Sequence, residues 1–480
     1  MSKKKKEVTI EVIGGNAEGV TGSCSKISFF GRNICFELGM IQDNSTILGN
    51  YKDNCAILNK LKPKSIDMVI VGHNHCDHIG LIPMLFARGN NDVKIIVPKD
   101  STCILKEMWS DCAYINERDC ETLNRNGDKS YTPLYTQTEV NAALRNIIEI
   151  EIGNIVKIDE NVSIRYTPAG HILRSCQTEL YINGGSHTKK IYFSSDLGNR
   201  MIEDKKVFVE KFQPITSANI AIVESTYGRR VGSMSKKDII LDREKMKTVI
   251  EQYCVDNKRR VLIPTFSLDR MPFILWELYQ LFGDDDNFDI PILVDSPLSN
   301  RLLDCYSSIL YGDAKEKFDE MMSWKNIKRI ITPEDSKAAI ADKRPKVICA
   351  SSGMLTAGRS VKWVQNILPN ENDCLLFIGY SGLDTLAGRI KHGASNKTIT
   401  INGKPYKNKC NIVDLHSYSS HMQNKDLINY YKSLNCEKIY LCHGDKQARI
   451  ELKEDLEKAL ADCYKSTRVI ILNKGTKISL

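Results

Sequence analysis

The stretch Val71–Gly80 reads VGHNHCDHIG and places three of the chain's nine histidines within six positions. It follows a β-branched run that ends at Val69-Ile70-Val71, and an apolar, helix-like stretch comes next. Imidazole and carboxylate are ligands that zinc prefers, and a tight loop can point alternate residues at two adjacent ions. The pattern H-x-H-x-D-H therefore predicts that His73, His75, Asp77 and His78 bind metal. The alternative is a polar loop whose side chains cap a helix.

Four further expected strands end in a polar side chain that could bind metal or take part in catalysis. His171 ends SIRYTPAGH, Asp196 ends IYFSSD, Glu224 ends NIAIVE and His443 ends KIYLCH. The carboxyl ends of strands are where α/β proteins gather functional side chains, so these endings are expected to converge on one site. Taken singly, each of these residues could instead have a purely structural role, as a core residue, a turn residue or a helix cap.

Taken together, the candidate ligands complete a two-metal site. Three histidines and a shared aspartate, Asp196, serve one ion, and an aspartate, two histidines and the same bridge serve the other. This count leaves a position for water, which is typical of a catalytic metal. We expect two zinc ions, with manganese as the alternative, and a hydroxide available near neutral pH. Hydrolysis is the chemistry that such a site favours.

Length and composition predict a soluble protein of two domains. A chain of 480 residues exceeds the roughly 250 to 300 residues that one core supports, and 42% hydrophobic with 26% charged residues is ordinary globular composition. The start, MSKKKKEVTI, lacks an apolar signal segment, and no run of about 18 apolar residues occurs. No cysteine pair has C-x-x-C spacing. We expect a cytoplasmic protein without membrane contact.

The formal net charge of +8 leaves room for a polyanionic partner. Basic residues cluster at Lys3 to Lys6, Arg229-Arg230 and Lys258 to Arg260. Such clusters are more often simply solvated surface, so charge alone does not decide the partner.

Strand-like and helix-like runs alternate in the middle of the chain. RRVLIPTF precedes LDRMPFILWELYQLF, IPILVDS precedes PLSNRLLDCYSSIL, and KVICASS precedes GRSVKWVQNIL. This rhythm predicts a parallel, doubly wound sheet. The expected organisation is a first domain over residues 1–226, an α/β insertion over 227–413, and a return to the first domain over 414–480.

Several separated motifs carry a family resemblance. H-x-H-x-D-H, a glycine-histidine turn, the aspartate and the late histidine resemble the metallo-β-lactamase fold, an α/β protein built as an αββα sandwich. GGNAEGVTGSC, VESTYG, VDSPLS, SSGMLTAGR, GYSGLDTLAGR and HSYSSHMQNKDL are similar to its β-CASP branch. The likeness is greatest to two-domain bacterial and archaeal ribonucleases similar to the endonuclease of the cleavage and polyadenylation specificity factor. It implies a β-CASP parallel-sheet domain inserted into the sandwich.

The resemblance also implies catalytic roles. Glu224 corresponds to the acidic residue of the first β-CASP motif and His421 to the histidine of the second, a pair that can protonate a leaving alkoxide. Asp77 and Asp196 are the catalytic carboxylates. The alternative is that Glu224 ends a strand and His421 caps the following helix. His443 occupies a position that is typically valine in DNA-processing relatives, which implies single-stranded RNA as the substrate.

Ser351, Ser352, Gly353 and Arg359 follow an expected strand and open a helix. Backbone N–H groups there could hold a phosphate, with a bidentate contact from Arg359, and the alternative is a helix cap with a surface arginine. Ser267, Arg270 and Ser296 are weaker candidates. Glu37 departs from the family, which usually has aspartate there, so a hydrogen bond behind the metal site is expected to be re-aimed.

The resemblance therefore implies a zinc-dependent ribonuclease that cleaves phosphodiester bonds with a two-metal-activated hydroxide. Endonuclease action is expected, exonuclease action stays open, and a homodimer is allowed. The alternatives are a DNA nuclease of the same family, a small-molecule metallohydrolase, and a catalytically weak RNA-binding scaffold.

Overall fold

A computed structural model describes residues 7–15, 19–42, 46–125, 130–184, 187–229, 235–379, 381–382, 385–393 and 397–480. Lys3 to Lys6, Arg230 and parts of the motifs GGNAEGVTGSC and GYSGLDTLAGR lie outside these residues. The chain forms two compact units. The first comprises Met1–Glu203, Val209–Ser233 and Ser420–Leu480, and the second comprises Asp204–Phe208 and Met234–Ser419. No helix in the described ranges is long and apolar enough to cross a membrane.

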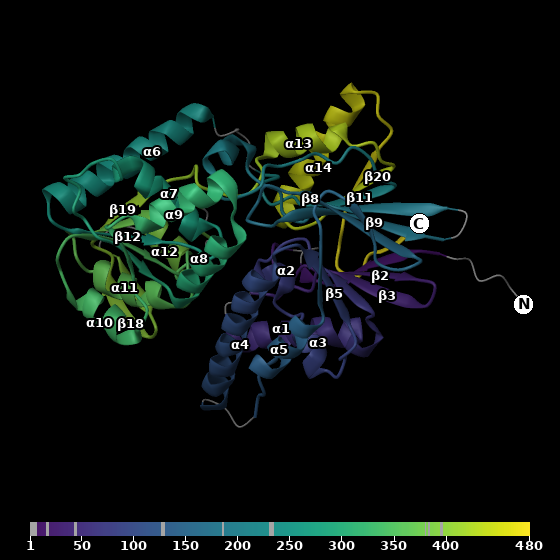
Figure 1. Cartoon of the computed structure of the whole chain (residues 1–480), viewed down its shortest axis with the longest axis horizontal. Coiled ribbons are helices and arrows are strands. Elements are labelled where there is room, and N and C mark those ends of the chain that lie inside the picture. The colour runs from purple at the N-terminus through teal and green to yellow at the C-terminus, as the bar shows by residue number, and fades with distance from the viewer. Residues whose placement is uncertain are drawn as a thin grey trace, which may run out of the picture. The chain divides into compact units, whose positions relative to one another are not determined.

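Two sheets form the centre of the first unit (Figure 1). One sheet runs in the spatial order β22 (Lys477–Ser479), β1 (Thr9–Val12), β2 (Ser25–Phe29), β3 (Arg32–Phe36), β4 (Met68–Ile70), β5 (Lys94–Pro98) and β6 (Ile147–Ile150). The other runs β21 (Arg468–Ile471), β20 (Lys438–Leu441), β11 (Ile220–Val223), β10 (Thr188–Phe193), β9 (Cys176–Asn183), β8 (Val162–Pro168) and β7 (Ile155–Lys157). Strands of the C-terminal segment pair, in both sheets, with strands that precede Met234 in the chain: β22 pairs with β1, and β20 pairs with β11. The returning segment therefore completes this unit.

A shared apolar core lies between the two sheets. Ile27 and Ile34 of the first sheet and Ile164 and Leu180 of the second belong to one buried cluster, because alternate side chains of each strand face inward. The rings of Phe36 and Phe193 stack across the sheets with centroids 4.0 Å apart.

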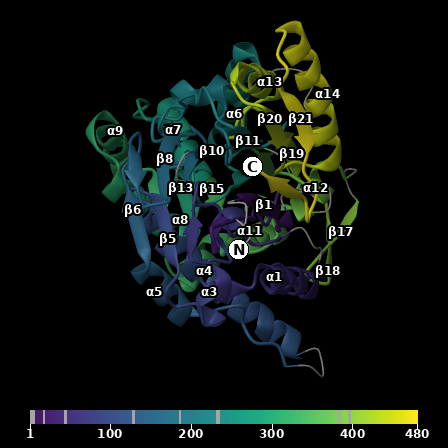
Figure 2. The same cartoon turned by 90° about the vertical axis from the view of Figure 1, so that its right-hand side faces the viewer.

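Helices cover the outer faces of the sandwich. They are α1 (Ile47–Leu61), α2 (Cys76–Ile79), α3 (Met84–Ala87), α4 (Thr102–Arg125) and α5 (Gln137–Arg145) beside the first sheet, and α13 (Asn424–Ser433) and α14 (Lys446–Asp462) on the second. The last two lie side by side in both views (Figure 2) and bury Leu427, Tyr431, Leu452 and Leu456 against β10, β11 and β20. Two 3₁₀ turns, Pro63–Ser65 and Arg200–Lys205, complete the helical segments. The expected αββα sandwich is confirmed.

The second unit is built on a parallel sheet. Its spatial order is β14 (Ile327–Arg329), β13 (Ile292–Asp295), β15 (Lys346–Ala350), β12 (Arg260–Pro264), β16 (Cys374–Phe377) and β19 (Asn411–Asp414). Every pairing in it is parallel, which confirms the alternating pattern of the sequence. A hairpin of β17 (Thr398–Ile401) and β18 (Lys404–Lys407) stands apart.

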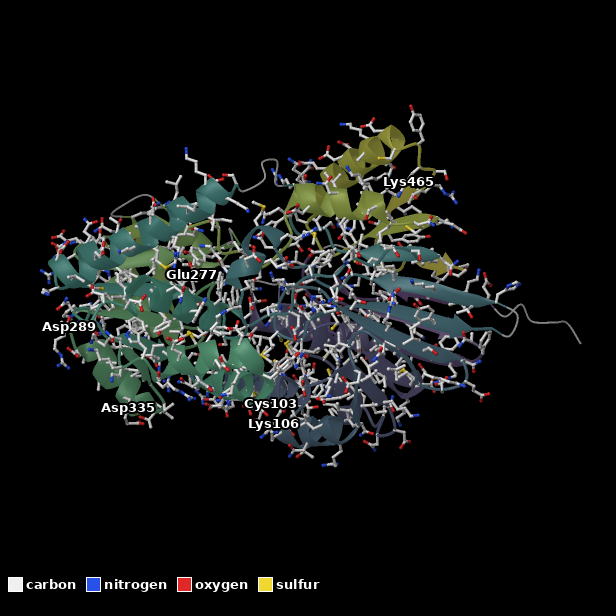
Figure 3. The ribbon with its side chains drawn as sticks, turned by 45° about the horizontal axis from the view of Figure 1, so that its top comes forward. Cys103, Lys106, Glu277, Asp289, Asp335 and Lys465 are labelled. Atoms are coloured by element: carbon white, nitrogen blue, oxygen red, sulfur yellow. The ribbon has the colours of Figure 1, made fainter. Side chains whose placement is uncertain are left out.

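Helices between these strands pack on the parallel sheet. They are α6 (Lys236–Ile250), which continues as a π-helical turn over Glu251–Asp256, α7 (Arg270–Phe282), α8 (Pro297–Ile309), α9 (Gly312–Ser323), α10 (Pro333–Ala341), α11 (Arg359–Ile367) and α12 (Leu386–Lys391). Glu277 of α7, labelled in Figure 3, is buried; Arg243 lies 3.3 Å and Lys205 3.8 Å from its carboxylate. The cations offset the cost of burying that charge.

Candidate metal centre

The candidate ligands of the first unit stand just beyond strand ends. His73 follows β4, His171 follows β8, Asp196 follows β10 and His443 follows β20, each within three residues of the strand. His75 precedes the short helix α2, which carries Asp77 and His78. Because these strands lie in the two facing sheets, their loops reach one end of the sandwich, and the structure brings all seven side chains together.

One group of donor atoms contains His73, His75, His171 and Asp196. His75 Nδ1 lies 3.2 Å from His73 Nε2 and 3.3 Å from His171 Nε2. Asp196 Oδ2 lies 3.5 Å from His73 Nε2 and 3.7 Å from His171 Nε2. Donors about 2.0–2.1 Å from a tetrahedral zinc lie roughly 3.3–3.4 Å from one another, so this spacing fits one ion.

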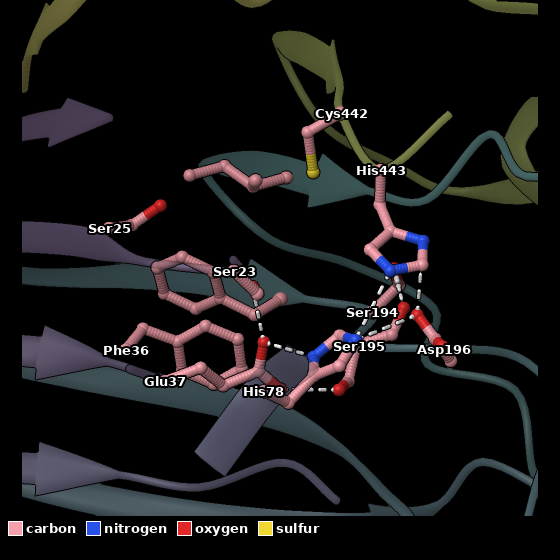
Figure 4. Close-up of a pocket in the computed structure, with 12 residues that line it drawn as sticks. Ser23, Ser25, Phe36, Glu37, His78, Ser194, Ser195, Asp196, Cys442 and His443 are labelled. Carbon is pink, nitrogen blue, oxygen red and sulfur yellow. Dashed lines mark hydrogen bonds and ion pairs between the residues drawn. The ribbon is translucent and has the colours of Figure 1, made fainter. Parts of the chain in front are cut away.

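A second group contains Asp77, His78 and His443. His78 Nε2 lies 3.2 Å from His443 Nε2 (Figure 4). It also lies 3.5 Å from Asp77 Oδ2. Asp196 approaches here with its other oxygen, since Oδ1 is 3.5 Å from His78 Nε2. The two oxygens of Asp196 thus face different groups, as a bridging carboxylate requires. Within the described residues Oδ1 is buried without a hydrogen-bond partner, which also fits a cation.

The far nitrogens of the imidazoles are held from behind. Nδ1 of His78 lies 2.6 Å from Glu37 Oε2, and Nδ1 of His171 lies 3.2 Å from the carbonyl oxygen of Ser420. Nδ1 of His443 lies 3.0 Å from Thr226 Oγ1 and 3.3 Å from Asp196 Oδ1. A ring whose Nδ1–H donates outward keeps a lone pair on Nε2, the atom that faces the cluster. His75 is reversed and presents Nδ1.

Burial and mutual charges shift the pKa values of this cluster. Burial raises the pKa of Asp196, but the nearby imidazoles of His443 and His78 outweigh it and bring the pKa to about 2. Burial lowers the pKa of His75 to about 3. Burial also acts to lower the pKa of His443, whereas the Asp196 carboxylate raises it to about 9. The Asp196 carboxylate is therefore ionised at neutral pH and available to a cation.

Close backbone packing holds the loop that carries the candidate ligands His73, His75, Asp77 and His78. A Cβ on Gly39 would lie 1.6 Å from the carbonyl oxygen of Asp77, so only glycine permits this approach. On the other side, Trp109 Nε1 of α4 donates to the carbonyl of Ile79, and the Tyr135 hydroxyl donates to that of Gly80. The loop is thus held by contacts with residues that are not candidate ligands.

His421 and Glu224 lie beside the same aspartate. His421 Nδ1 is 3.8 Å from Glu224 Oε2 and 4.0 Å from Asp196 Oδ2 and, within the described chain, makes no hydrogen bond. Glu224 is buried and accepts from the amide of Leu197. The His421 ring contacts the rings of His171 and Tyr227, and its side chain is 24% exposed. Backbone bonds from Asn199 and Met422 clamp this segment to the Asp196 loop.

The candidate phosphate-binding residues belong to the second unit. Ser351 Oγ lies 2.8 Å from Ser267 Oγ at the ends of β15 and β12. Ser352 Oγ accepts from the amide of Thr356, and Gly353 lies against the Phe266 ring. Arg359 donates to Asp295 at 2.6 Å and to two backbone carbonyls. A bidentate phosphate contact by Arg359 would require these bonds to be exchanged. Ser296 lies 3.3 Å from Ser267, and Arg270 donates to the carbonyl of Ile378.

Sequence reasoning missed the residues that hold the imidazoles from behind. Ser195 and Thr226 contact His73 and His443, and Ser23 donates to the Glu37 carboxylate behind His78, yet a serine or threonine in a loop carries no signal of its own. Near them in the sequence, Asp196 and Glu224 are the residues that the motifs predict to act in the site. Glu37 lies behind the site: its Oε2 is 2.6 Å from His78 Nδ1, and its Oε1 is 3.8 Å from His73 Nδ1.

Two domain families match the chain. Residues 273–390 match the Beta-Casp domain, and residues 405–466 match the Zn-dependent metallo-hydrolase RNA specificity domain.

Similar curated proteins cover most of the chain. Transcription termination factor FttA of Methanocaldococcus jannaschii is 25% identical over 82% of this chain and 61% of its own length. Ribonuclease TTHA0252 of Thermus thermophilus is 24% identical over 91% and 94%. Cleavage and polyadenylation specificity factor subunit 3-II of Arabidopsis thaliana is 24% identical over 94% and 69%. The chain thus spans about three fifths of the FttA relative.

A solved structure shares the fold. A protein of unknown function from Enterococcus faecalis V583 aligns with a TM-score of 0.53 at 12% identity, covering 99% of this chain and all of that one.

Proposed function

We propose, from the premise that this chain belongs to the β-CASP family of metallo-β-lactamase-fold proteins, that it is a zinc-dependent ribonuclease. It would hydrolyse phosphodiester bonds of single-stranded RNA, as an endonuclease and with exonuclease action allowed. Two zinc ions would be held by His73, His75, His171 and Asp196, and by Asp77, His78, His443 and Asp196. Imidazole-rich donor sets of this kind suit zinc better than magnesium.

The observation that carries the proposal is the position of His421. Its Nδ1 lies 4.0 Å from Asp196 Oδ2 and 3.8 Å from Glu224 Oε2, outside the two donor groups that contain His73, His75 and His171, and His78 and His443. A phosphodiesterase can use this imidazole, because the leaving alkoxide requires a proton.

Bound zinc ions would supply a nucleophile by lowering the pKa of water to about 7 and would neutralise charge on the phosphate. Asp196 and Asp77 position the site through their carboxylates. His421 donates a proton to the leaving 3′ oxygen from Nε2, the nitrogen that does not face Glu224. Glu224, fixed by the amide of Leu197, orients that ring.

RNA as the substrate is supported by the match to an RNA specificity domain and by relatives whose names include ribonuclease. A further support is His443, because the RNA-processing branch of the family that the chain resembles carries histidine at this position. Ser351, Ser352 and Gly353 would contact a phosphate through hydroxyl and backbone N–H groups. Arg359 would support that loop through Asp295, and its own phosphate contact would follow only on rearrangement.

Matched single strands of RNA and DNA test the proposal. Purified protein is incubated with end-labelled RNA and DNA of one sequence, with chelator and after zinc is restored. We expect internal cleavage of RNA that chelator abolishes and zinc restores. Equal cleavage of DNA, or RNA binding without cleavage in zinc, would contradict it.

A further inference from the structure

Two residues behind His73 adopt the left-handed backbone conformation. Glu37 has φ 58° and Ser195 has φ 48°. This region is unfavourable for residues with a Cβ, and glycine would adopt it more readily. Strained positions of this kind cluster at functional sites. At both of these positions the side chain is directed at the metal centre.

Ser195 joins Glu37 to His73. Its Oγ lies 2.6 Å from Glu37 Oε1 and 2.9 Å from His73 Nδ1. The direct distance from Glu37 Oε1 to His73 Nδ1 is 3.8 Å, which is too long for a hydrogen bond. The hydroxyl therefore completes a contact that the carboxylate cannot make itself.

The chemistry of these groups sets the direction of both hydrogen bonds. A carboxylate only accepts, so the Ser195 hydroxyl donates to Glu37 and its oxygen then accepts Nδ1–H of His73. Nε2 of His73 is left with its lone pair, and it faces His75 Nδ1 at 3.2 Å. One tautomer of His73 is thereby selected.

The other oxygen of Glu37 acts on the second donor group, since Oε2 bonds His78 Nδ1 and the Ser23 hydroxyl, each at 2.6 Å. Gly72 accommodates the arrangement. A Cβ there would lie 2.6 Å from Ser195 Oγ and 2.8 Å from Glu37 Oε1, so the two side chains occupy the space that a larger residue would fill.

We propose that Ser195 is a positioning residue that relays Glu37 to His73 and fixes the histidine for zinc. The inference rests on the metal centre of the proposed function. On this proposal, the Glu37 carboxylate orients one histidine of each donor group. It contacts His78 directly and His73 through the Ser195 hydroxyl.

Ser195→Gly separates positioning from folding. Glycine removes the hydroxyl but suits φ 48°, so the metal-free variant should melt no lower than the wild type. Its zinc affinity, measured by competition with a chromophoric chelator, should fall about 10- to 100-fold at one of two sites, the usual effect of losing a contact behind a ligand. Lys62→Gly, at φ 58° beyond α1, is the matched control and should bind zinc normally.

A double-mutant cycle tests the relay itself. Glu37→Gln should weaken zinc binding, and adding Ser195→Gly should weaken it by less than the product of the single effects, because both changes break one chain of contacts. Wild-type affinity in Ser195→Gly, a lower melting temperature of that metal-free variant, or fully multiplicative effects would overturn the relay. If these zinc results hold while the wild type cleaves no RNA, the relay stands and the ribonuclease proposal fails.

Discussion

At the scale of residues, the candidate metal centre depends on which nitrogen each imidazole presents. Four rings direct Nε2 inward and are held at Nδ1, whereas His75 directs Nδ1 inward. A ring held through its far nitrogen loses little conformational freedom when an ion binds, so ordering the ring costs little of the binding free energy.

Asp196→Ala should remove metal and activity together, because both carboxylate oxygens face donor groups. We expect zinc per chain to fall below one, with RNA cleavage lost. Elemental analysis and cleavage of the same samples measure this, with the exposed Asp313→Ala as control. Retained turnover would exclude a shared bridging ligand.

His421→Ala should separate metal binding from cleavage. Both ions stay bound because His421 belongs to neither ligand set, while single-turnover cleavage slows about 10²- to 10⁴-fold through loss of the general acid. His416→Ala, an exposed histidine nearby in sequence, serves as control. Loss of zinc in step with activity, or an unchanged rate, would show that His421 is a ligand or a helix cap.

Glu224→Gln should give a milder form of the His421 defect. The amide keeps the size of the side chain but not the charge that faces His421 Nδ1 at 3.8 Å. Zinc content should stay at the wild-type value and single-turnover cleavage should fall by less than in His421→Ala. A larger loss than in His421→Ala would place Glu224 in another role.

At the scale of elements, the site is a meeting of strand ends and one short helix. β4 and α2 bring the H-x-H-x-D-H loop, and β8, β10 and β20 bring the remaining ligands from the facing sheet. The loop is seated between the segment after β3 and helix α4. The precision of the centre therefore comes from backbone contacts between elements that contribute no ligand.

Gly39→Ala tests this seating. The added methyl would overlap the backbone of Asp77, which no rotamer change can relieve, so the loop must shift. We expect lower zinc occupancy and a lower melting temperature, measured by metal analysis and circular dichroism. Among the described residues, a Cβ on Gly382 would have no contact closer than 3.4 Å, so Gly382→Ala should leave both unchanged. A wild-type result for Gly39→Ala would mean that the loop tolerates displacement.

At the scale of the whole molecule, two compact units have separate cores, and all nine candidate ligand and proton-transfer residues lie in the first. A ligand that binds only the native state stabilises the part of the protein that forms its binding site. Zinc should therefore stabilise the histidine-bearing unit selectively.

Metal removal should make this selectivity visible. With chelator, amide hydrogen exchange should accelerate in the loops after β4, β10 and β20, while peptides from β12, β13 and β15 keep their rates. Mass spectrometry with and without zinc resolves the two sets. Equal acceleration in both units would contradict selective stabilisation.

The amino-acid sequence by itself determined the fold class, the parallel sheet of the insertion and the identity of the candidate ligands. The parallel sheet and the candidate ligands follow from local pattern: alternation of strand and helix, a histidine-rich loop after a β-branched run, and polar residues at strand ends. The αββα sandwich is implied by the family resemblance of separated motifs. The sequence could also mark Glu37 as a departure, since that rests on residue identity alone.

Only the tertiary structure decided how those residues are held. Ser195 reaches His73 and Glu37 across more than a hundred positions, Gly39 packs on Asp77, and Arg359 is engaged by Asp295. Hydroxyls, glycines and arginines occur throughout any chain, and what distinguishes these is a partner brought near by folding. Contacts between distant segments leave no periodic trace in sequence, because their geometry is set by how strands, sheets and helices pack.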